Sequence, residues 1–401
     1  MAQQATTATA NGPIYGGANN GAITNAGTAA ERRALYLKLF SGEMFKGFQH
    51  NTIARDLVTR RTLKNGKSLQ FIYTGRTKSE FHIPGQSILG NNEKTPPVAE
   101  KTITVDDLLI SSAFVYELDE TLAHYDLRGE ISRKIGYALA ENYDRRIFRA
   151  ITKAARQPSP VTMSNFVEPG GSVIKVGAAA STTAGDAYNS AHLVNAFYDA
   201  AATLDEKGVS GDGRVAVLNP RQYYALIQDV NNNGLINRDE TGSVLQSGNG
   251  IISIAGIKIY KSMNIPFFGK FGTKTDMNPR ASNDNEGSFV GEAMGDQDQA
   301  ANSGTPAGGQ KTTNNYGTAA KFANSCGLIF QKEAAGVVEA IGPSVQTTSG
   351  DVSVVYQGDV ILGRLAMGAD FLNPACAVEL VAGIDVSSNF NNTAVSNASF
   401  T

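Results

Sequence analysis

The segment that decides the fold is Glu100–Ala140, with the sequence EKTITVDDLLISSAFVYELDETLAHYDLRGEISRKIGYALA. It begins with residues that alternate between apolar and polar, a period of two that is typical of a strand. An acidic turn follows, and Asp126 is a good N-cap for the helical pattern after it. We predict one helix over residues 126–156, because Gln157-Pro158 disfavours its continuation.

The apolar residues of this helix recur every four positions: Ile131, Ile135, Leu139, Tyr143, Ile147 and Ile151. A four-residue step advances by about 400°, so the apolar stripe drifts by roughly 40° at each step. At ~1.5 Å per residue the helix is on the order of 45 Å long. We therefore predict a spine that packs against more than one partner. A long core helix of a globular enzyme is an equal alternative from this pattern alone.

Composition and charge bound the kind of protein. The chain has 401 residues, enough for two or three ordinary domains, but only 18% are charged, against about 25% in typical globular domains. This scarcity indicates that polar loops and subunit contacts cover part of the surface. The charge is uneven, with a net +8 over residues 31–78 and −4 over residues 101–125. These two segments could meet between copies of the chain or hold polyanions.

Cysteine usage and hydropathy give the expected compartment. Cys326 and Cys376 lie far apart and fit no metal-binding spacing, so we expect free thiols from a reducing compartment. No apolar run approaches the ~18 residues that a membrane-spanning helix needs, and the N-terminus lacks the features of a signal peptide. We expect a soluble cytoplasmic product with no cofactor and no membrane contact.

The first hundred residues divide into an arm, a helix and an excursion. Residues 1–30 carry no charge and predict a flexible arm. Residues 31–48 form an amphipathic pattern, from which we expect Phe40, Phe45 and Phe48 to pack against another body. Strand patterns at 67–73 and 101–105 then flank about twenty-five residues without core periodicity. An excursion of that length is uncommon, and reaching over a neighbour is its simplest use.

Residues 189–262 predict a compact α/β unit. Its expected elements are helices at 191–205 and 221–228 and strands at 214–218 and 254–260. A segment rich in Gly, Asn, Gln and Thr lies between residues 269 and 324 and predicts a surface insertion. Further strands are expected at 328–330, 336–341, 352–356, 360–364 and 375–381.

Motifs that would indicate site chemistry are weak. Asp229–Glu240 fits the calcium-loop pattern D-x-[DN]-x-[DN]-G-x5-E. No helix pattern follows it and Asn replaces Asp at two ligand positions, so an ordinary Asn-Gly loop is favoured. The four histidines have no metal-binding spacing, and no G-x-S-x-G occurs. The residues give no support for an enzyme.

The predicted spine helix carries a run of basic residues: Arg145, Arg146, Arg149, Lys153 and Arg156. Such a run could contact phosphates. We favour a solvated helix face or salt bridges to a neighbouring copy over this phosphate contact.

Short motifs in a fixed order carry a resemblance to a known family. They include LYLKLF at 35–40, Gly66-Lys67-Ser68, Gly75-Arg76-Thr77, Pro84-Gly85, Asp107-Leu108-Leu109, His124-Tyr125-Asp126, Asn219-Pro220 and Ala366-Met367-Gly368. With these the chain resembles the major capsid proteins of T7-like podoviruses, a marine cyanophage relative in particular, over roughly residues 31–265 and 327–385. The resemblance implies an α+β fold of the Hong Kong 97 type.

That fold has named parts, and the resemblance assigns them to ranges of this sequence. The expected parts are an N-terminal arm at 1–66, an E-loop at 67–105, a P-domain at 106–188 with a spine helix at 126–156, an A-domain at 189–326 with the insertion at 269–324, P-domain return strands at 327–385 and a tail at 386–401.

The resemblance also implies a function. Hexamers and pentamers would tile an icosahedral virion shell around double-stranded DNA, assembled in the host cytoplasm with a scaffolding protein and a portal protein. A decoration protein could contact the insertion. The residues expected at subunit interfaces are Phe40, Phe45, Phe48, Lys67, Arg76, Pro84, Gly85, Arg145 and Arg146. Two alternatives stay open: an encapsulin-like nanocompartment shell that encloses a cargo enzyme, and a soluble calcium-binding protein built around Asp229–Glu240.

Overall fold

The computed structural model describes only part of the chain. The described residues are 14–15, 23–24, 53–77, 79, 81–87, 96, 98–116, 127–160, 162–163, 166–177, 184–227, 253–262, 264–265, 314, 316, 325–347 and 357–382. Several predictions lie outside them: the amphipathic helix with Phe40, Phe45 and Phe48, the calcium-loop candidate Asp229–Glu240, the strand at 352–356 and the tail.

The chain divides into two compact units. Unit 1 holds Met1–Asn51, Leu109–Leu139 and Pro343–Leu365, and unit 2 holds Thr52–Leu108, Ala140–Gly342 and Ala366–Thr401. Three long elements contribute residues to both units: helix α4 (Leu127–Arg156) and strands β14 (Ala335–Thr347) and β15 (Gly358–Phe371). The helix predicted at 126–156 is confirmed as α4.

Unit 1 is a helix packed on a strand pair. Strand β6 (Leu109–Tyr116) runs antiparallel to β15, and residues of both strands meet the first half of α4 in a small apolar core. Gly363 allows this close approach, because a Cβ at that position would lie 2.4 Å from a methyl carbon of Ile135. Strand β6 and the first half of α4, both within Glu100–Ala140, therefore pack against each other.

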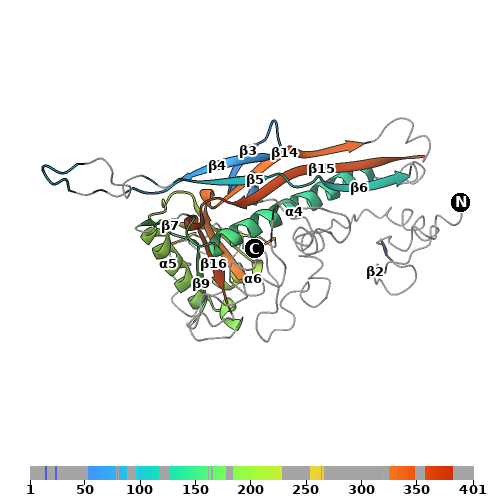
Figure 1. The fold of residues 1–401 in the computed structure, drawn as a ribbon. Helices are drawn as coiled ribbons and strands as arrows, with labels where there is room; N and C mark the ends of the chain where they lie inside the picture. The colour runs from blue at the N-terminus through green and yellow to red at the C-terminus, as the bar shows by residue number, and fades with distance from the viewer. Residues whose placement is uncertain are drawn as a thin grey trace. The chain divides into compact units, whose positions relative to one another are not determined.

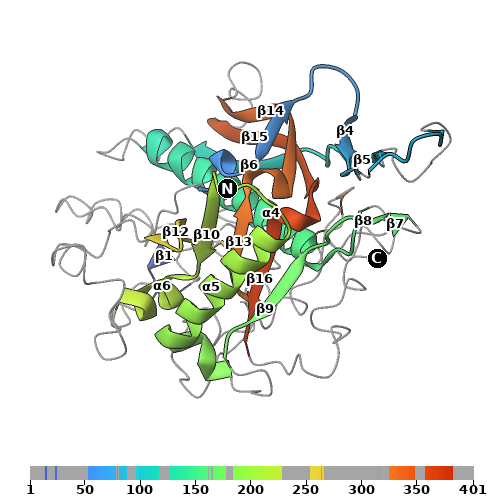
Figure 2. The same cartoon turned by 90° about the vertical axis from the view of Figure 1, so that its left-hand side faces the viewer.

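Unit 2 contains a six-stranded sheet with two helices. The strand order is β11 (Ser253–Ile254), β12 (Ile257–Lys261), β10 (Arg214–Leu218), β13 (Ser325–Gln331), β16 (Ala377–Val381) and β9 (Ser172–Lys175). Helices α5 (Ser190–Glu206) and α6 (Pro220–Ile227) bury apolar residues against it. Figure 2 shows α5 lying along one face of this sheet.

Two details of this unit differ from the sequence predictions. The strand predicted at 254–260 is a tight hairpin, because Ala255 and Gly256 both have positive φ, 51° and 77°. Two successive positive φ values are typical of a type I′ turn. Strands β13 and β16 pair in the same sheet as β10, so the predicted boundary at residue 326 does not separate two sheets.

A long antiparallel hairpin also belongs to unit 2. Strands β4 (Ser68–Thr74) and β5 (Val98–Thr104) lie side by side (Figure 1) and pair from Ser68 opposite Thr104 to Thr74 opposite Val98. Phe71 and Ile103 on these strands are buried with Val338 and Ala366. The hairpin is thus anchored in unit 2 by its own apolar residues, while residues 75–97, called the connecting loop below, join its far ends.

The remaining elements are short. Strand β3 (Thr59–Thr62) pairs in parallel with β14, β1 (Ile14–Tyr15) pairs with β2 (Ile23–Thr24), and β7 (Thr162–Met163) pairs with β8 (Phe166–Val167). The 3-10 helices are η2 (Ala54–Asp56), η4 (Ala184–Tyr188), η7 (Lys332–Ala334) and η8 (Pro374–Cys376). Within the described ranges, no helix is both long and apolar enough to cross a membrane.

Candidate functional site

The hairpin exposes large apolar side chains along its outer part. Ile72 and Val98 are 75% and 65% exposed, and in the connecting loop Phe81 is 100% and Ile83 is 59% exposed. Large apolar side chains seldom gather at the surface of one element, and where they do they indicate an interaction site. The sequence placed an excursion here but did not single out these four residues. Aromatic and β-branched residues within a Pro-Gly segment that lacks core periodicity were the available signal.

A turn in the connecting loop presents Ile83. The Gln86 N–H donates to the Ile83 carbonyl at 3.1 Å, and Gly85 has a φ of +90°. Proline followed by glycine with positive φ is the combination that a type II turn favours. Pro84 and Gly85 therefore have a local structural role, and their assignment to a subunit interface stays a prediction.

The half of α4 in unit 2 carries buried charges. Its buried charged residues, each at most 8% exposed, are Asp144, Arg145, Arg146, Arg149, Lys153 and Arg156. The prediction of a solvated basic face is therefore wrong. Arg145 pairs with Glu141 one turn earlier at 2.5 Å, and Arg146 pairs with Asp106 of the same chain at 2.8 Å. These internal pairs also argue against phosphate contact, while the interface assignment of Arg145 and Arg146 stays a prediction.

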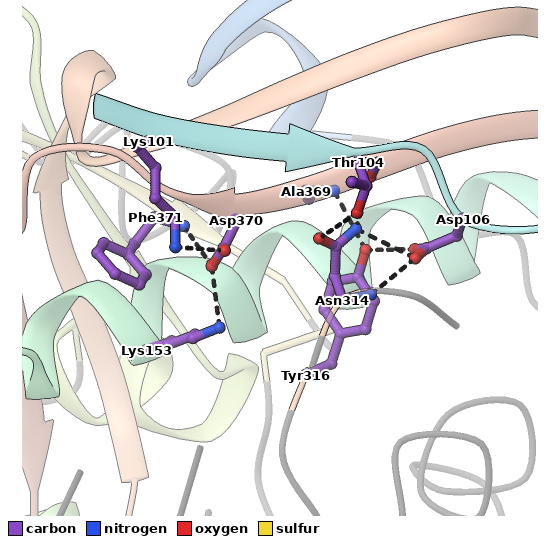
Figure 3. A network of polar contacts seen from close by, with 9 residues as sticks. All are labelled: Lys101, Thr104, Asp106, Lys153, Asn314, Tyr316, Ala369, Asp370 and Phe371. Atoms are coloured by element: carbon purple, nitrogen blue, oxygen red, sulfur yellow. Dashed lines mark hydrogen bonds and ion pairs between the residues drawn. The ribbon is translucent and has the colours of Figure 1, made fainter. Parts of the chain in front are cut away.

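Asp106 is the centre of the first buried network (Figure 3). One carboxylate oxygen accepts from Arg146 at 2.8 Å and from the Tyr316 hydroxyl at 2.6 Å. The other accepts from the backbone and side-chain N–H groups of Asn314, both at 3.1 Å. The Tyr316 hydroxyl accepts from the Ala369 N–H at 3.1 Å, and burial raises the pKa of Tyr316 well above its usual range. Two residues of the predicted insertion are thereby fixed in unit 2.

Asp370 is the centre of a second network, also drawn in Figure 3. Lys101 and Lys153 lie 2.8 and 3.0 Å from its two oxygens, and both ammonium groups stand over the Phe371 ring. Lys101 and Asp106 both come from the segment 101–125, so part of the charge that the sequence offered to another copy is used inside the chain.

Two further buried carboxylates, Glu339 and Glu379, bind α4 to other elements of unit 2. Glu339 on β14 accepts from the Tyr143 hydroxyl at 2.6 Å and lies 3.2 Å from Arg55 and 3.6 Å from Arg60. Burial raises the pKa of Tyr143. These contacts join η2, β3, α4 and β14, and the paired charges offset much of the cost of taking each charge out of water.

The second of these carboxylates, Glu379 on β16, accepts two hydrogen bonds of 2.6 Å from Arg156 at the end of α4. A bidentate arginine–carboxylate pair combines strong attraction with a fixed geometry. The end of the helix is therefore held on the six-stranded sheet.

Lys67 and Arg76, two other predicted interface residues, have different surroundings. Lys67 is exposed, and its carbonyl accepts from the Val105 N–H at the base of the hairpin. The Arg76 guanidinium donates to the Lys207 carbonyl and lies 3.9 Å from the Glu168 carboxylate. Arg76 thus has a role within its own chain, and its assignment to an interface stays a prediction.

Asp144 differs from the other buried acids in its partners. Its carboxylate accepts from the backbone N–H groups of Ile53 and Ala54 at 2.9 and 3.3 Å, and from the Asn264 side chain. Burial raises the pKa of Asp144 to about 7. The three hydrogen bonds lower this pKa by less than burial raises it, and the nearby Glu141 carboxylate raises it further. The start of η2 is therefore bound to a carboxyl group that titrates near neutral pH.

We expect the Asp144→Asn variant to change the pH dependence of stability. The folded chain binds this proton more tightly than the unfolded chain, whose pKa is near 3.8. The stabilisation is therefore present at acid pH and is lost as the pH rises from about 4 to about 7. Asparagine removes this titration, so between about pH 4 and about pH 7 the unfolding free energy of the variant should fall less steeply with rising pH than that of the wild type. The two slopes, measured by urea unfolding at each pH, should differ by on the order of 1 kcal/mol per pH unit. Asp56→Asn, at an exposed acid of η2, is the control. Superimposable profiles for wild type and Asp144→Asn would contradict the expectation.

Comparisons with known proteins identify the family. Residues 70–381 match the Gp10A-like major capsid protein family. The chain belongs to this family. The major capsid protein of Escherichia phage T7 is 27% identical over 199 residues, which cover 50% of this chain and 57% of the relative. That of Enterobacteria phage T3 is 34% identical over 128 residues, 32% of this chain and 37% of the relative. The chain thus matches about half or less of the length of these relatives.

Solved structures agree with the family and establish the fold. The capsid structure of the cyanophage P-SCSP1u is 30% identical, with a TM-score of 0.63, and the match covers 91% of this chain and 99% of that chain. The mature capsid of bacteriophage PhiM1 is 16% identical with a TM-score of 0.54, covering 85% and 90%, and supports the fold alone. The resemblance to capsid proteins of T7-like phages and the α+β fold of the Hong Kong 97 type are confirmed.

Proposed function

We propose that this capsid protein assembles as hexamers and pentamers into an icosahedral shell, with a structural and not an enzymatic role. The observation that carries the proposal is the hairpin with its exposed Ile72, Phe81, Ile83 and Val98, in a chain of a capsid family. Exposed apolar groups of this size are stabilised when a second copy covers them. The chain would act in the virion, after assembly in the host cytoplasm.

The fold suggests which parts take which place in the shell. We assign the hairpin and connecting loop, residues 67–105, to the E-loop, and α4 to the spine helix of the P-domain. The six-stranded sheet with α5 and α6 corresponds to the A-domain, and β6, β14 and β15 correspond to the P-domain sheet. This division follows the sheets of the structure in place of the sequence boundary at 326.

Electron microscopy tests the proposal. The full chain would be produced with and without a scaffolding protein, and closed shells of uniform size are the expected result. A chain that stays a compact single molecule at high concentration, with its connecting loop protected from protease, would overturn the proposal.

The contact itself can be tested at Phe81. This side chain is fully exposed, so Phe81→Ser should leave the unfolding free energy of the unassembled chain unchanged. If Phe81 is covered in the shell, its loss costs about 1.5–3 kcal/mol per contact, and the protein concentration needed for assembly should rise by about tenfold or more. Light scattering at graded concentrations measures this shift. Phe81→Leu, which keeps most of the apolar area, should assemble nearly as wild type. Equal assembly by Phe81→Ser and wild type would exclude a contact at this residue.

We also propose that the shell encloses double-stranded DNA. Arg61, Lys64 and Lys67 are exposed and form no ion pair within the described residues, and such a basic stretch suits the phosphate backbone without sequence preference. Nuclease-resistant DNA inside purified particles is the expected result, whereas a protein cargo without DNA would favour the nanocompartment alternative. Scaffolding and portal proteins, and a decoration protein at the insertion, are further partners that the family resemblance suggests.

A further inference from the structure

The hairpin is held by a buried carboxylate at the point where the connecting loop leaves it. Glu168, which directly follows β8, is 2% exposed. Its carboxylate accepts from the Arg76 backbone N–H and from the Tyr73 hydroxyl at 3.3 Å, and lies 3.9 Å from the Arg76 side chain. A buried charge with several donors forms a strong and directional contact.

A second contact holds the same arginine from another element. The Arg76 guanidinium donates to the carbonyl of Lys207, the C-cap residue that directly follows α5. The next residue, Gly208, has a φ of +68°, and a Cβ there would lie 3.1 Å from a guanidinium nitrogen. Glycine therefore both permits the turn after α5 and leaves room for Arg76. The hairpin is attached to unit 2 from two directions at one residue.

The exposure of the side chains changes at Arg76. On β4 exposure alternates, with Phe71 buried, Ile72 exposed and Tyr73 partly buried, whereas the described residues 77, 79 and 81–87 are all exposed. Arg76 thus marks the boundary between the part of the hairpin that unit 2 holds and the part that carries Phe81 and Ile83. A contact at such a boundary controls the direction in which the following segment leaves the body.

We propose that Glu168 is a positioning residue that sets the direction of the connecting loop, so that Phe81 and Ile83 are presented to a second copy of this chain. The inference rests on the proposed shell function and deepens it. Glu168 touches no other copy in this scheme. It acts through the Arg76 backbone and the Tyr73 hydroxyl, and it lowers the entropy that the loop loses when a neighbour covers it.

The test measures the loop in the unassembled chain and assembly separately. Both native cysteines are buried, so spin labels can be attached selectively at Gln86→Cys in the loop and at the exposed Asn195→Cys on α5. Wild type should give a narrow distribution of label distances. Glu168→Ala should widen it at least twofold and raise the concentration needed for assembly at least tenfold. Glu206→Ala, at an exposed acid near the end of α5, should change neither.

Arg76→Ala is the second variant, in case Glu168→Ala does not fold. It removes both guanidinium contacts but keeps the backbone N–H, so the distribution should widen less than in Glu168→Ala. An unchanged distribution in both variants would overturn the inference even if shells form normally. A widened distribution with wild-type assembly would also overturn it, because direction would then not matter. Failure of the wild type itself to assemble would instead count against the proposed function.

Discussion

Replacing Glu379 by alanine is expected to lower the free energy of unfolding by about 3–5 kcal/mol, which is the usual cost of breaking a buried ion pair. The Arg156 and Glu379 side chains are 1% and 0% exposed and share two hydrogen bonds of 2.6 Å. Alanine leaves the guanidinium charge in a site with little water and without its bidentate partner. Urea unfolding of the unassembled chain, followed by circular dichroism, measures the change.

Asp205→Ala provides the matched control for this pair. Asp205 pairs with Arg214 at 2.7 Å, but its side chain is 69% exposed, and Arg214 keeps the carbonyls of Val209 and Ser210 as partners. Although the Arg214 side chain is only 6% exposed, it keeps these two acceptors and water screens the Asp205 carboxylate, so the loss should be no more than about 1 kcal/mol. The double variant Arg156→Met/Glu379→Met should lose much less stability than Glu379→Ala, because no charge remains buried. If Glu379→Ala and Asp205→Ala had equal effects, the pair would not hold α4 to the sheet.

The elements that the sequence predicted well depend on local signals. Helix α4 ends where Gln157-Pro158 disfavours further helix, and α5 begins after Asn189, whose side chain accepts from the Ala191 N–H as an N-cap. Strand β10 consists of five buried residues between a glycine turn and Asn219-Pro220, and its predicted bounds were right. The hairpin at 255–256 was missed because alanine rarely takes a positive φ.

The buried ion pairs of α4 could not be predicted, because most of them join distant parts of the sequence. Arg146 meets an acid 40 residues earlier, and Arg156 meets one 223 residues later. From the sequence alone, basic residues repeated along a helix predict a solvated face. Only the tertiary fold, which covers this half of α4 and brings carboxylates to Arg146, Lys153 and Arg156, reverses that expectation.

The hairpin and its exposed connecting loop were predicted in outline. The length of the excursion and its lack of core periodicity indicated an extended segment, and the structure has an anchored hairpin with an exposed connecting loop there. The individual apolar residues were not identified, because exposure in an irregular segment has no periodic signal. The acid that holds the loop, Glu168, lies about ninety residues from it in the sequence, so spacing could not indicate the contact.

Asp106→Ala is expected to lower the free energy of unfolding by about 3–5 kcal/mol for a related reason. Its carboxylate accepts from Arg146, from Tyr316 and twice from Asn314. Removing it leaves a buried guanidinium charge and several buried donors without this acceptor, and each unsatisfied donor costs about 1–3 kcal/mol. Because Asn314 and Tyr316 come from the insertion, the loss should also loosen that segment. Among the described residues, it would keep only the Asn314 contacts to Thr104 and the Tyr316 contacts to Arg146 and Ala369. Urea unfolding measures the first effect, and faster protease cleavage near residue 316 measures the second.

Tyr316→Phe separates the hydrogen bonds of this site from its charge. It removes the hydroxyl that donates to Asp106 and accepts from Ala369, but it keeps the ring beneath the Arg146 guanidinium, 5.3 Å from the ring centre. Its expected cost is about 1.5–3 kcal/mol, the contribution of a hydrogen bond to a charged group, and therefore less than that of Asp106→Ala. Gly368→Ala should resemble Asp106→Ala, because a Cβ there would lie 1.9 Å from the Thr104 carbonyl oxygen and force β15 away from β5. Wild-type stability of Asp106→Ala, or wild-type protease resistance of the segment around residue 316, would show that this network does not fix the insertion.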